Sequence, residues 1–229
     1  MNFTDENILF YIRVPDLISS LNLISGFISV ICTLHSNLRL ASLFIILAII
    51  FDCCDGWIAR RLNQVSESDF GKNMDSFADS ISFGLAPSIL LYQLGLQLNP
   101  QLNIVTIIFS IYLLLAGILR LARFNVIGSR TNGFIGLPIP TTALLLSTFY
   151  LSNLFNLYLA YIFIFVSSTL MISQIKYQKL NINVVLIIIL GILLFLIPFD
   201  LLIFNINLPA LLILLLTIVY LIPKGKAKL

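Results

Sequence analysis

The sequence predicts an all-α integral membrane protein with about eight transmembrane helices and both termini in the cytoplasm. Of its 229 residues, 59% are hydrophobic and 10% are charged, and the mean hydropathy is +1.06. A soluble domain is about 45–50% apolar and about 25% charged, so the composition excludes that class. Apolar runs near the roughly 20 residues that cross a bilayer recur along the chain.

Breaks marked by Asn, Pro, Gly and charged residues divide the chain into apolar segments. The predicted spans run from about Asp16 to Leu34, Leu38 to Leu62, Phe70 to Leu96, Leu102 to Phe124, Pro138 to Leu154, Leu157 to Ile175, Val184 to Phe199, and Leu201 to Ile222. We expect an N-terminal interfacial segment at residues 1–15, a six-helix catalytic core at 16–175, and two further helices with a basic tail at 176–229. Because the seventh span is short and tightly linked to the eighth, a re-entrant or tilted hairpin is an alternative for this last part.

The basic residues predict the orientation. With eight spans, one side of the membrane holds Arg39, and the other holds Arg13, Arg60, Arg61, Lys72, Arg120, Arg123, Arg130, Lys176, Lys179, Lys224, Lys226 and Lys228. Cytoplasmic loops carry an excess of Lys and Arg, so the second side is the cytoplasm. The sequence therefore predicts a multi-pass protein of the cell membrane. Residues 62–70, which link the end of span two to the start of span three, are predicted to lie on the cytoplasmic side.

Carboxylates gather at those ends. Six of the ten acidic residues lie within residues 52–79, although the flanks are apolar. At about 100° per residue, each of the two spans presents carboxylates and small residues on one face. The first face carries Asp52, Asp55, Gly56 and Ala59, and the second carries Gly71, Asp75, Asp79 and Ser82. Because a short link joins the two spans, these faces can meet.

Four carboxylates at the mouth of a helix pair repel one another unless cations lie among them. Oxygen ligands without a companion His or Cys favour Mg²⁺ or Mn²⁺, and four carboxylates suit two such ions. The small residues leave room for a phosphate-bearing group, and Arg60 and Lys72 add positive charge for it. The alternative is that these are ordinary interfacial carboxylates paired with nearby cations, and we assign Glu67 and Asp69 to that class. The four aligned aspartates lie within spans, where ionisable groups are costly and usually functional.

These residues carry a family resemblance. The stretch resembles the signature of the CDP-alcohol phosphotransferases, D-x-x-D-G-x-x-A-R, a spacer, then G-x-x-x-D-x-x-x-D. Its fixed positions are filled by Asp52, Asp55, Gly56, Ala59, Arg60, Gly71, Asp75 and Asp79. The spacer between Arg60 and Gly71 has ten residues, about two more than is usual in the family. FGKNMDSFADSISFGLAPS, GILRLARFNV, GLPIPTTA and PDLISSLNLISG are similar to blocks of its phosphatidylserine synthase branch.

The resemblance implies an enzyme that joins an alcohol to the lipid phosphate of a CDP-linked lipid and releases CMP. Its substrates would be CDP-diacylglycerol or CDP-archaeol and L-serine, and a homodimer in the bilayer is the family expectation; we expect no nucleic-acid partner. By the same resemblance, Asp52, Asp55 and Asp75 hold divalent metal, and Asp79 ligates metal, acts as the general base, or both. The residues expected to contact CDP are Ser20, Asn22, Gly56, Ala59, Arg60, Gly71 and Lys72.

The acceptor site is predicted at the cytoplasmic end of span four. The carboxylate of serine needs a cationic or amide partner, and Arg120, Arg123 and Asn125 end this span, with Arg130 in the loop that follows. Arg120 and Arg123 share a helix face, and Arg123 suits a bidentate contact with a carboxylate. Positive-inside anchoring is the alternative role for these arginines.

The sequence leaves two other functions open. The same enzyme class includes members with other acceptors, such as glycerol 3-phosphate or inositol phosphate, but a phosphorylated acceptor needs more clustered cations than lie around Arg123. A divalent-cation transporter would also place aspartates within spans. The glycines and the arginine set between the aspartates disfavour a transporter.

Overall fold

Helices, some of them long enough to span a membrane, make up most of the part of the chain that the structure describes. The computed structural model describes residues 12–61, 69–127, 134–177, 191–192, 196–197, 202–203 and 205–222. Helix α1 covers Val14–Leu34, α2 Leu38–Arg61 and α5 Asn103–Ile127, while α3 (Asp69–Asp79), a π-helical segment η3 (Ser80–Leu85) and α4 (Ala86–Leu98) form one continuous rod. Within the described residues, four stretches are long and apolar enough to cross a membrane: Val14–Leu34, Leu38–Ala59, Phe70–Leu98 and Pro100–Ile127. The predicted class, an all-α membrane protein, is confirmed.

Three shorter helices and two small ladders complete the described part. Helix α6 covers Ile139–Leu151, α7 Leu157–Ile172 and α9 Leu208–Leu221, and a 3₁₀ turn, η4, covers Pro100–Leu102. Strand β1 (Phe134–Ile135) pairs antiparallel with β2 (Lys176–Tyr177), and β3 (Leu202–Ile203) pairs with β4 (Ile206–Asn207). The first six predicted spans correspond to helices, whereas span seven lies almost entirely outside the described residues.

Span eight begins later than predicted. Its helix starts at Leu208, where the Asn207 side chain accepts a hydrogen bond from the backbone N–H of Ala210 and Pro209 occupies the first turn. These are ordinary start signals of a helix, and the residues before them form the β3–β4 ladder instead. The first span begins slightly earlier than predicted, at Val14, because Asp16 accepts the backbone N–H of Arg13 at 2.7 Å. Residues 1–11 of the predicted interfacial segment lie outside the described ranges.

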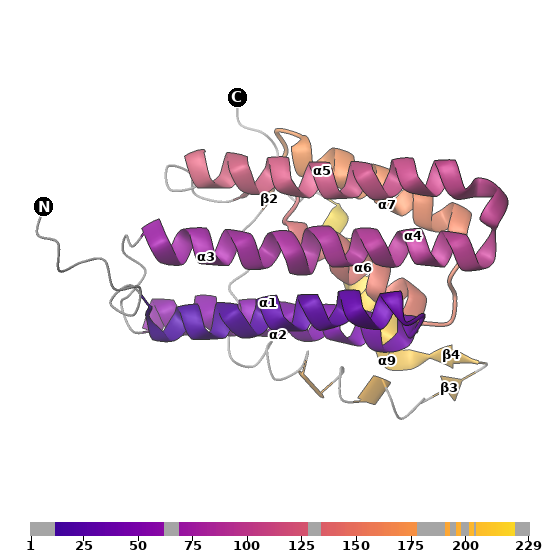
Figure 1. Ribbon diagram of the computed structural model, residues 1–229, viewed down its shortest axis with the longest axis horizontal. Coiled ribbons are helices and arrows are strands. Elements are labelled where there is room, and N and C mark those ends of the chain that lie inside the picture. The colour runs from indigo at the N-terminus through magenta and orange to yellow at the C-terminus, as the bar shows by residue number, and fades with distance from the viewer. Residues whose placement is uncertain are drawn as a thin grey trace, which may run out of the picture.

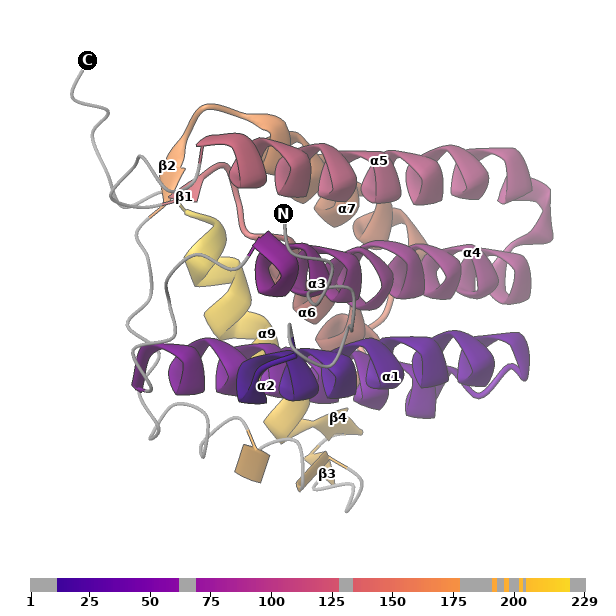
Figure 2. The same cartoon turned by 60° about the vertical axis from the view of Figure 1, so that its left-hand side comes forward.

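The long helices run side by side. Figures 1 and 2 show the α3–η3–α4 rod between the α1–α2 pair and α5, with α7 alongside α5 and α9 tilted across the bundle. The start of α1, the end of α2, the start of α3 and the end of α5 lie at one end of the bundle, which we call the site end (Figure 1). Large apolar side chains such as Leu17, Phe27, Ile108 and Phe165 point outward, as suits a surface that faces lipid.

The rod is packed tightly where it is π-helical. A Cβ added to Gly26 of α1 would lie 2.6 Å from the Cα of Ser82, so the two backbones touch at this crossing. Ser82 also donates its hydroxyl to the carbonyl of Asn22 at 2.9 Å. The sequence pattern predicted a regular helix here, and the π-helical segment that begins directly after Asp79 is a departure from it. The α1 crossing therefore fixes the rod next to the carboxylates.

Candidate functional site

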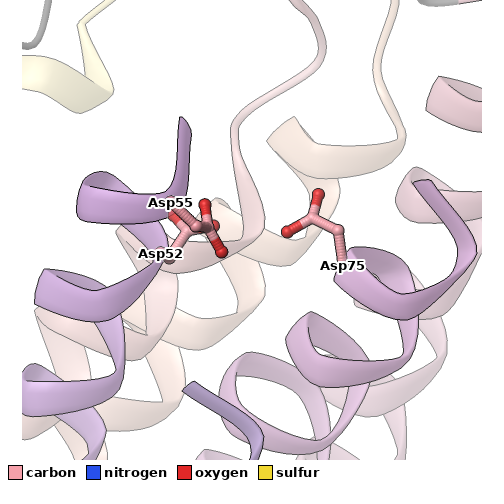
Figure 3. Close-up of side chains that lie close together, drawn as sticks. All are labelled: Asp52, Asp55 and Asp75. Carbon is pink, nitrogen blue, oxygen red and sulfur yellow. The ribbon is translucent and has the colours of Figure 1, made fainter. Parts of the chain in front are cut away.

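Three carboxylates meet between α2 and α3 at the site end. Asp52 and Asp55 extend from the last turns of α2 toward Asp75 of α3 (Figure 3). Each offers one oxygen, and these oxygens all lie within 4.8 Å of one another. The spacing of three residues on α2 places both of its carboxylates on the face toward α3, as predicted.

Asp79 lies beside this group, one helical turn deeper on α3. It is 6% exposed, and its carboxylate is close enough to interact electrostatically with Asp52, Asp75 and Asp55. It does not belong to the group of three oxygens. Its Oδ1 instead accepts a hydrogen bond from the Nδ2 of Asn22 at 3.2 Å. The four predicted aspartates therefore gather in one place, with the fourth in different surroundings.

Helix α1 supplies hydrogen-bond donors to the acids. Ser19 donates to Asp55 Oδ2 at 2.6 Å, and Asn22 donates to Asp79, one turn further along the same face. Ser20, predicted to contact the nucleotide, donates instead to the carbonyl of Asp16 within α1 at 2.8 Å. Buried donors aimed at carboxylates hold the rotamers of those carboxylates.

Arg120 brings positive charge to the cluster. Its side chain on α5 is 5% exposed, its guanidinium carbon lies 5.2 Å from the centre of the Phe124 ring, and it interacts electrostatically with Asp79 and Asp52. One buried arginine does not balance four carboxylates, so the cluster still favours further positive charge. Of the four residues predicted for the acceptor, Arg120 is the one whose described surroundings include the acids.

Asn125 and Lys72, predicted to contact different substrates, contact each other. Lys72 Nζ donates to the backbone carbonyl of Asn125 at 2.6 Å. The Asn125 side chain exchanges hydrogen bonds with the Ser76 hydroxyl, with its Nδ2 2.8 Å and its Oδ1 3.2 Å from that oxygen. These contacts fasten the end of α5 to α3 on both sides of Asp75, through Lys72 before it and Ser76 directly after it.

Arg123 is engaged with backbone. Its Nη1 donates to the carbonyls of Ile172 and Ser173 at 3.0 and 2.9 Å, and its Nη2 donates to those of Ile135 and Met171 at 2.8 and 2.6 Å. The guanidinium thus joins α5 to the end of α7 and to β1. Within the described part of the chain, no carboxylate accepts a hydrogen bond from its Nη groups.

The other predicted residues fall into two groups. Gly56, Ala59 and Gly71 are partly exposed residues of α2 and α3 near the acids, where a phosphate could approach. The side chain of Arg60 and all of Arg130 lie outside the described residues.

Sequence reasoning missed three neighbours of the acids. Ser19 bonds Asp55, Ser76 bonds Asn125, and Asp16, 7% exposed, interacts electrostatically with Asp55 and Asp75. A signal for Ser19 and Asp16 was present, because they share a face with Asn22 at intervals of three residues. Nothing in the sequence distinguished Ser76 from the other serines of its span.

The donor set fits a hard divalent cation. Three convergent carboxylate oxygens at these separations can bind one ion, and the described residues around them add no His. Cys53 and Cys54 lie between two of the aspartates in sequence, but they form no disulfide and do not belong to the group of three carboxylates. The site therefore suits Mg²⁺ or Mn²⁺ better than zinc.

Comparison with known proteins gives a consistent result. The model of the CDP-alcohol phosphatidyltransferase family matches residues 12–173, well over half of the chain. This matched range contains every carboxylate of the site and each residue predicted to contact a substrate.

Curated relatives are similar over most of their length. The chain is 40% identical over 177 residues to archaetidylserine synthase of Methanothermobacter thermautotrophicus, covering 77% of this chain and 74% of the relative. It is 42% identical over 169 residues to CDP-diacylglycerol–serine O-phosphatidyltransferase of Methanocaldococcus jannaschii, covering 73% and 75%. The Bacillus subtilis protein of the latter name is 39% identical over 165 residues, covering 72% and 89%.

Proposed function

Because the chain belongs to the CDP-alcohol phosphatidyltransferase family, we propose that it transfers the phosphatidyl or archaetidyl group of a CDP-linked lipid to the hydroxyl of L-serine. The products are the serine phospholipid and CMP. The observation that carries the proposal is the group of three carboxylate oxygens from α2 and α3, within 4.8 Å of one another, with Asp79 and Arg120 beside it. Relatives named for serine transfer favour this acceptor over the others of the class.

The roles follow from the chemistry of the residues. Asp52, Asp55 and Asp75 would hold a divalent cation, Mg²⁺ or Mn²⁺, with Asp79 as a further ligand of a second ion. When bound, such ions neutralise the diphosphate and favour the departure of CMP. Gly56, Ala59, Arg60 and Gly71 would lie against the CDP group, with Ser20 and Lys72 near it.

Asp79 is the proposed general base. The serine hydroxyl oxygen forms a bond to the lipid-side phosphorus, the bond from that phosphorus to the CMP oxygen breaks, and the hydroxyl proton passes to Asp79. Arg120 would pair with the carboxylate of serine, and its buried position beside Asp79 supports this role. Arg123, Asn125 and Arg130 would shape the rim of the acceptor site, the first two through the contacts that fasten α5 to its neighbours.

The topology completes the proposal. Eight spans with both termini in the cytoplasm would put the site end at the cytoplasmic face of the cell membrane, where water-soluble serine and CMP exchange. Residues 16–175 would form the catalytic core and 176–229 the added C-terminal part. A homodimer is expected from the family.

The function is tested with labelled serine. Membranes containing the protein, CDP-diacylglycerol or CDP-archaeol, and Mn²⁺ or Mg²⁺ are expected to yield serine-labelled lipid and an equal amount of CMP. Asp79→Asn should lower kcat by at least about 100-fold, since it removes the base. Glu67→Gln, a change of the same kind at a predicted loop position, should not. Absence of labelled lipid from the wild type, or an Asp79→Asn variant as fast as the wild type, would reject the proposal.

Other acceptors are separated by a panel. Mass spectrometry of products formed from CDP-lipid and a mixture of serine, glycerol 3-phosphate and inositol phosphate should detect the serine lipid in excess. A phosphorylated product would instead keep the enzyme class and change the acceptor. A divalent-cation transporter predicts metal flux without CMP release, and the family membership argues against it.

A further inference from the structure

Asn22 has surroundings unlike those of a nucleotide ligand. Its side chain is fully buried, at 0% exposure, and its Nδ2 points to the Oδ1 of Asp79 at 3.2 Å. Its own Oδ1 is buried and accepts no hydrogen bond within the described part of the chain. Leaving a buried amide oxygen without a donor costs free energy. An amide kept at such a cost is expected to serve something other than stability, and the group that it contacts is Asp79.

The crossing of α1 over η3 holds Asn22 in place. The Asn22 carbonyl accepts from Ser82, and one turn further along α1 the absence of a side chain at Gly26 lets the α1 backbone touch Ser82. The π-helical segment that contains Ser82 starts immediately after Asp79. Since α1 is attached to the rod on the C-terminal side of Asp79, the backbone of Asn22 cannot move away from Asp79 without breaking this crossing.

We propose that Asn22 is a positioning residue for Asp79, and that it holds the carboxylate toward the acceptor hydroxyl through its Nδ2–H. The inference rests on the proposed role of Asp79 as the base. It replaces the expectation that Asn22 binds CDP. A carboxylate has about four lone-pair sites, so an N–H donated to Oδ1 fixes the rotamer and leaves sites for a metal ion and for the proton of the acceptor.

The test separates positioning from nucleotide binding. Asn22→Leu has nearly the same size and no donor, so in purified protein kcat for CMP release should fall about 10- to 100-fold. The KM for CDP-lipid, and the Kd values of CMP and of Mn²⁺ measured without turnover, should stay within about threefold. The solvent deuterium isotope effect on kcat should rise, because a displaced base makes proton transfer slower relative to the other steps. Ser29→Ala removes another fully buried side-chain donor of α1, one bonded to the carbonyl of Ala41, and should leave all of these values unchanged.

Each other outcome contradicts the inference. A kcat within about twofold of the wild type overturns it, and so does weaker CMP binding with kcat preserved, which would return Asn22 to the nucleotide site. If Asn22→Leu does not fold, Asn22→Asp keeps the size and sets a carboxylate against Asp79. Its kcat should fall at least as far, and a wild-type kcat in this variant also overturns the inference.

Failure of the proposed function gives a different pattern. If Asp79→Asn is inactive while both Asn22 variants turn over at the wild-type rate, the positioning role alone is wrong. If Asp79→Asn keeps the wild-type kcat, the base assignment is wrong and the positioning role falls with it. CMP release is measured with whichever acceptor the panel identifies, so an acceptor other than serine leaves the inference intact.

Discussion

Arg123 has a contact pattern that a substrate ligand rarely has, because both of its Nη groups are bonded to backbone. Three of the four carbonyls, those of Met171, Ile172 and Ser173, belong to the end of α7, where a helix leaves carbonyls without N–H partners. A cation there also complements the helix dipole. Gly136 makes this geometry possible: its φ is +81°, and an added Cβ would meet the Met171 carbonyl and the Arg123 guanidinium.

We therefore expect Arg123→Lys to affect stability more than serine binding. A lysine cannot reach four carbonyls in a fork, so the free energy of unfolding should fall by about 2–3 kcal/mol and the apparent Tm in detergent by roughly 5–10 °C. Arg61→Lys, at an exposed arginine that lies 5.3 Å from the centre of the Trp57 ring, should leave Tm nearly unchanged. An unchanged Tm in Arg123→Lys, with a KM for serine raised tenfold or more, would restore Arg123 to the acceptor.

The sequence identified residues of the site better than it identified their partners. Aspartates inside apolar spans stand out because they are costly there, so Asp52, Asp55, Asp75 and Asp79 were predictable. Which donor faces which carboxylate depends on how the helices pack. The sequence pattern does not show which of two neighbouring residues of the same type points toward the site. The prediction from sequence therefore names Ser20, although its neighbour Ser19 is the residue that bonds Asp55.

At the scale of elements, α3 is held from two sides. Helix α1 contacts it through Asn22, and α5 contacts it through Asn125, which bonds Ser76 and Lys72. Because Asp75 directly precedes Ser76, the position of this carboxylate depends on the α3–α5 contact. The helix pattern of the sequence indicates one continuous span, whereas the structure has a π-helical segment after Asp79, packed against α1, α5 and α6.

Breaking the α3–α5 contact should weaken metal binding. In Asn125→Leu the Kd for Mn²⁺ is expected to rise about 10-fold, the effect that outer partners of metal ligands commonly have. Ser76→Ala should act in the same direction, and the double variant should be no worse than Asn125→Leu, since both changes remove one interaction. Electron paramagnetic resonance of free Mn²⁺ measures this Kd.

Tyr112→Phe provides the matched control, because it removes a 2.9 Å hydrogen bond to Thr169 between α5 and α7. It should leave the Kd for Mn²⁺ unchanged. A raised KM for serine in Asn125→Leu, with Mn²⁺ binding intact, would show that Asn125 contacts the acceptor.

At the scale of the molecule, the site is assembled from several helices, and its cluster of carboxylates would not by itself hold these helices together. Helices α1, α2, α3 and α5 all contribute residues to it. Helix α9, which lies beyond the range matched by the family, also reaches the site, because its Tyr220 interacts electrostatically with Arg120. Tyr177 of β2 donates a hydrogen bond to the carbonyl of Leu221 at the end of α9, at 3.1 Å. Carboxylates from α2 and α3 repel each other across this junction. Apolar packing against lipid and between helices opposes that repulsion, and a bound divalent cation would remove it.

A divalent cation should accordingly stabilise the whole fold. Binding only to the folded state at 100 times Kd adds about 2.7 kcal/mol, so Mn²⁺ or Mg²⁺ should raise the apparent Tm in detergent by roughly 5–10 °C, and EDTA should reverse the shift. Asp52→Asn and Asp75→Asn each remove a ligand and some repulsion, so both variants should melt at or above the metal-free wild type and respond little to the ions. Glu67→Gln should respond like the wild type. An equal Mn²⁺ shift in Asp75→Asn would mean that the ion binds elsewhere, because the α2–α3 oxygens cannot form the same site without that carboxylate.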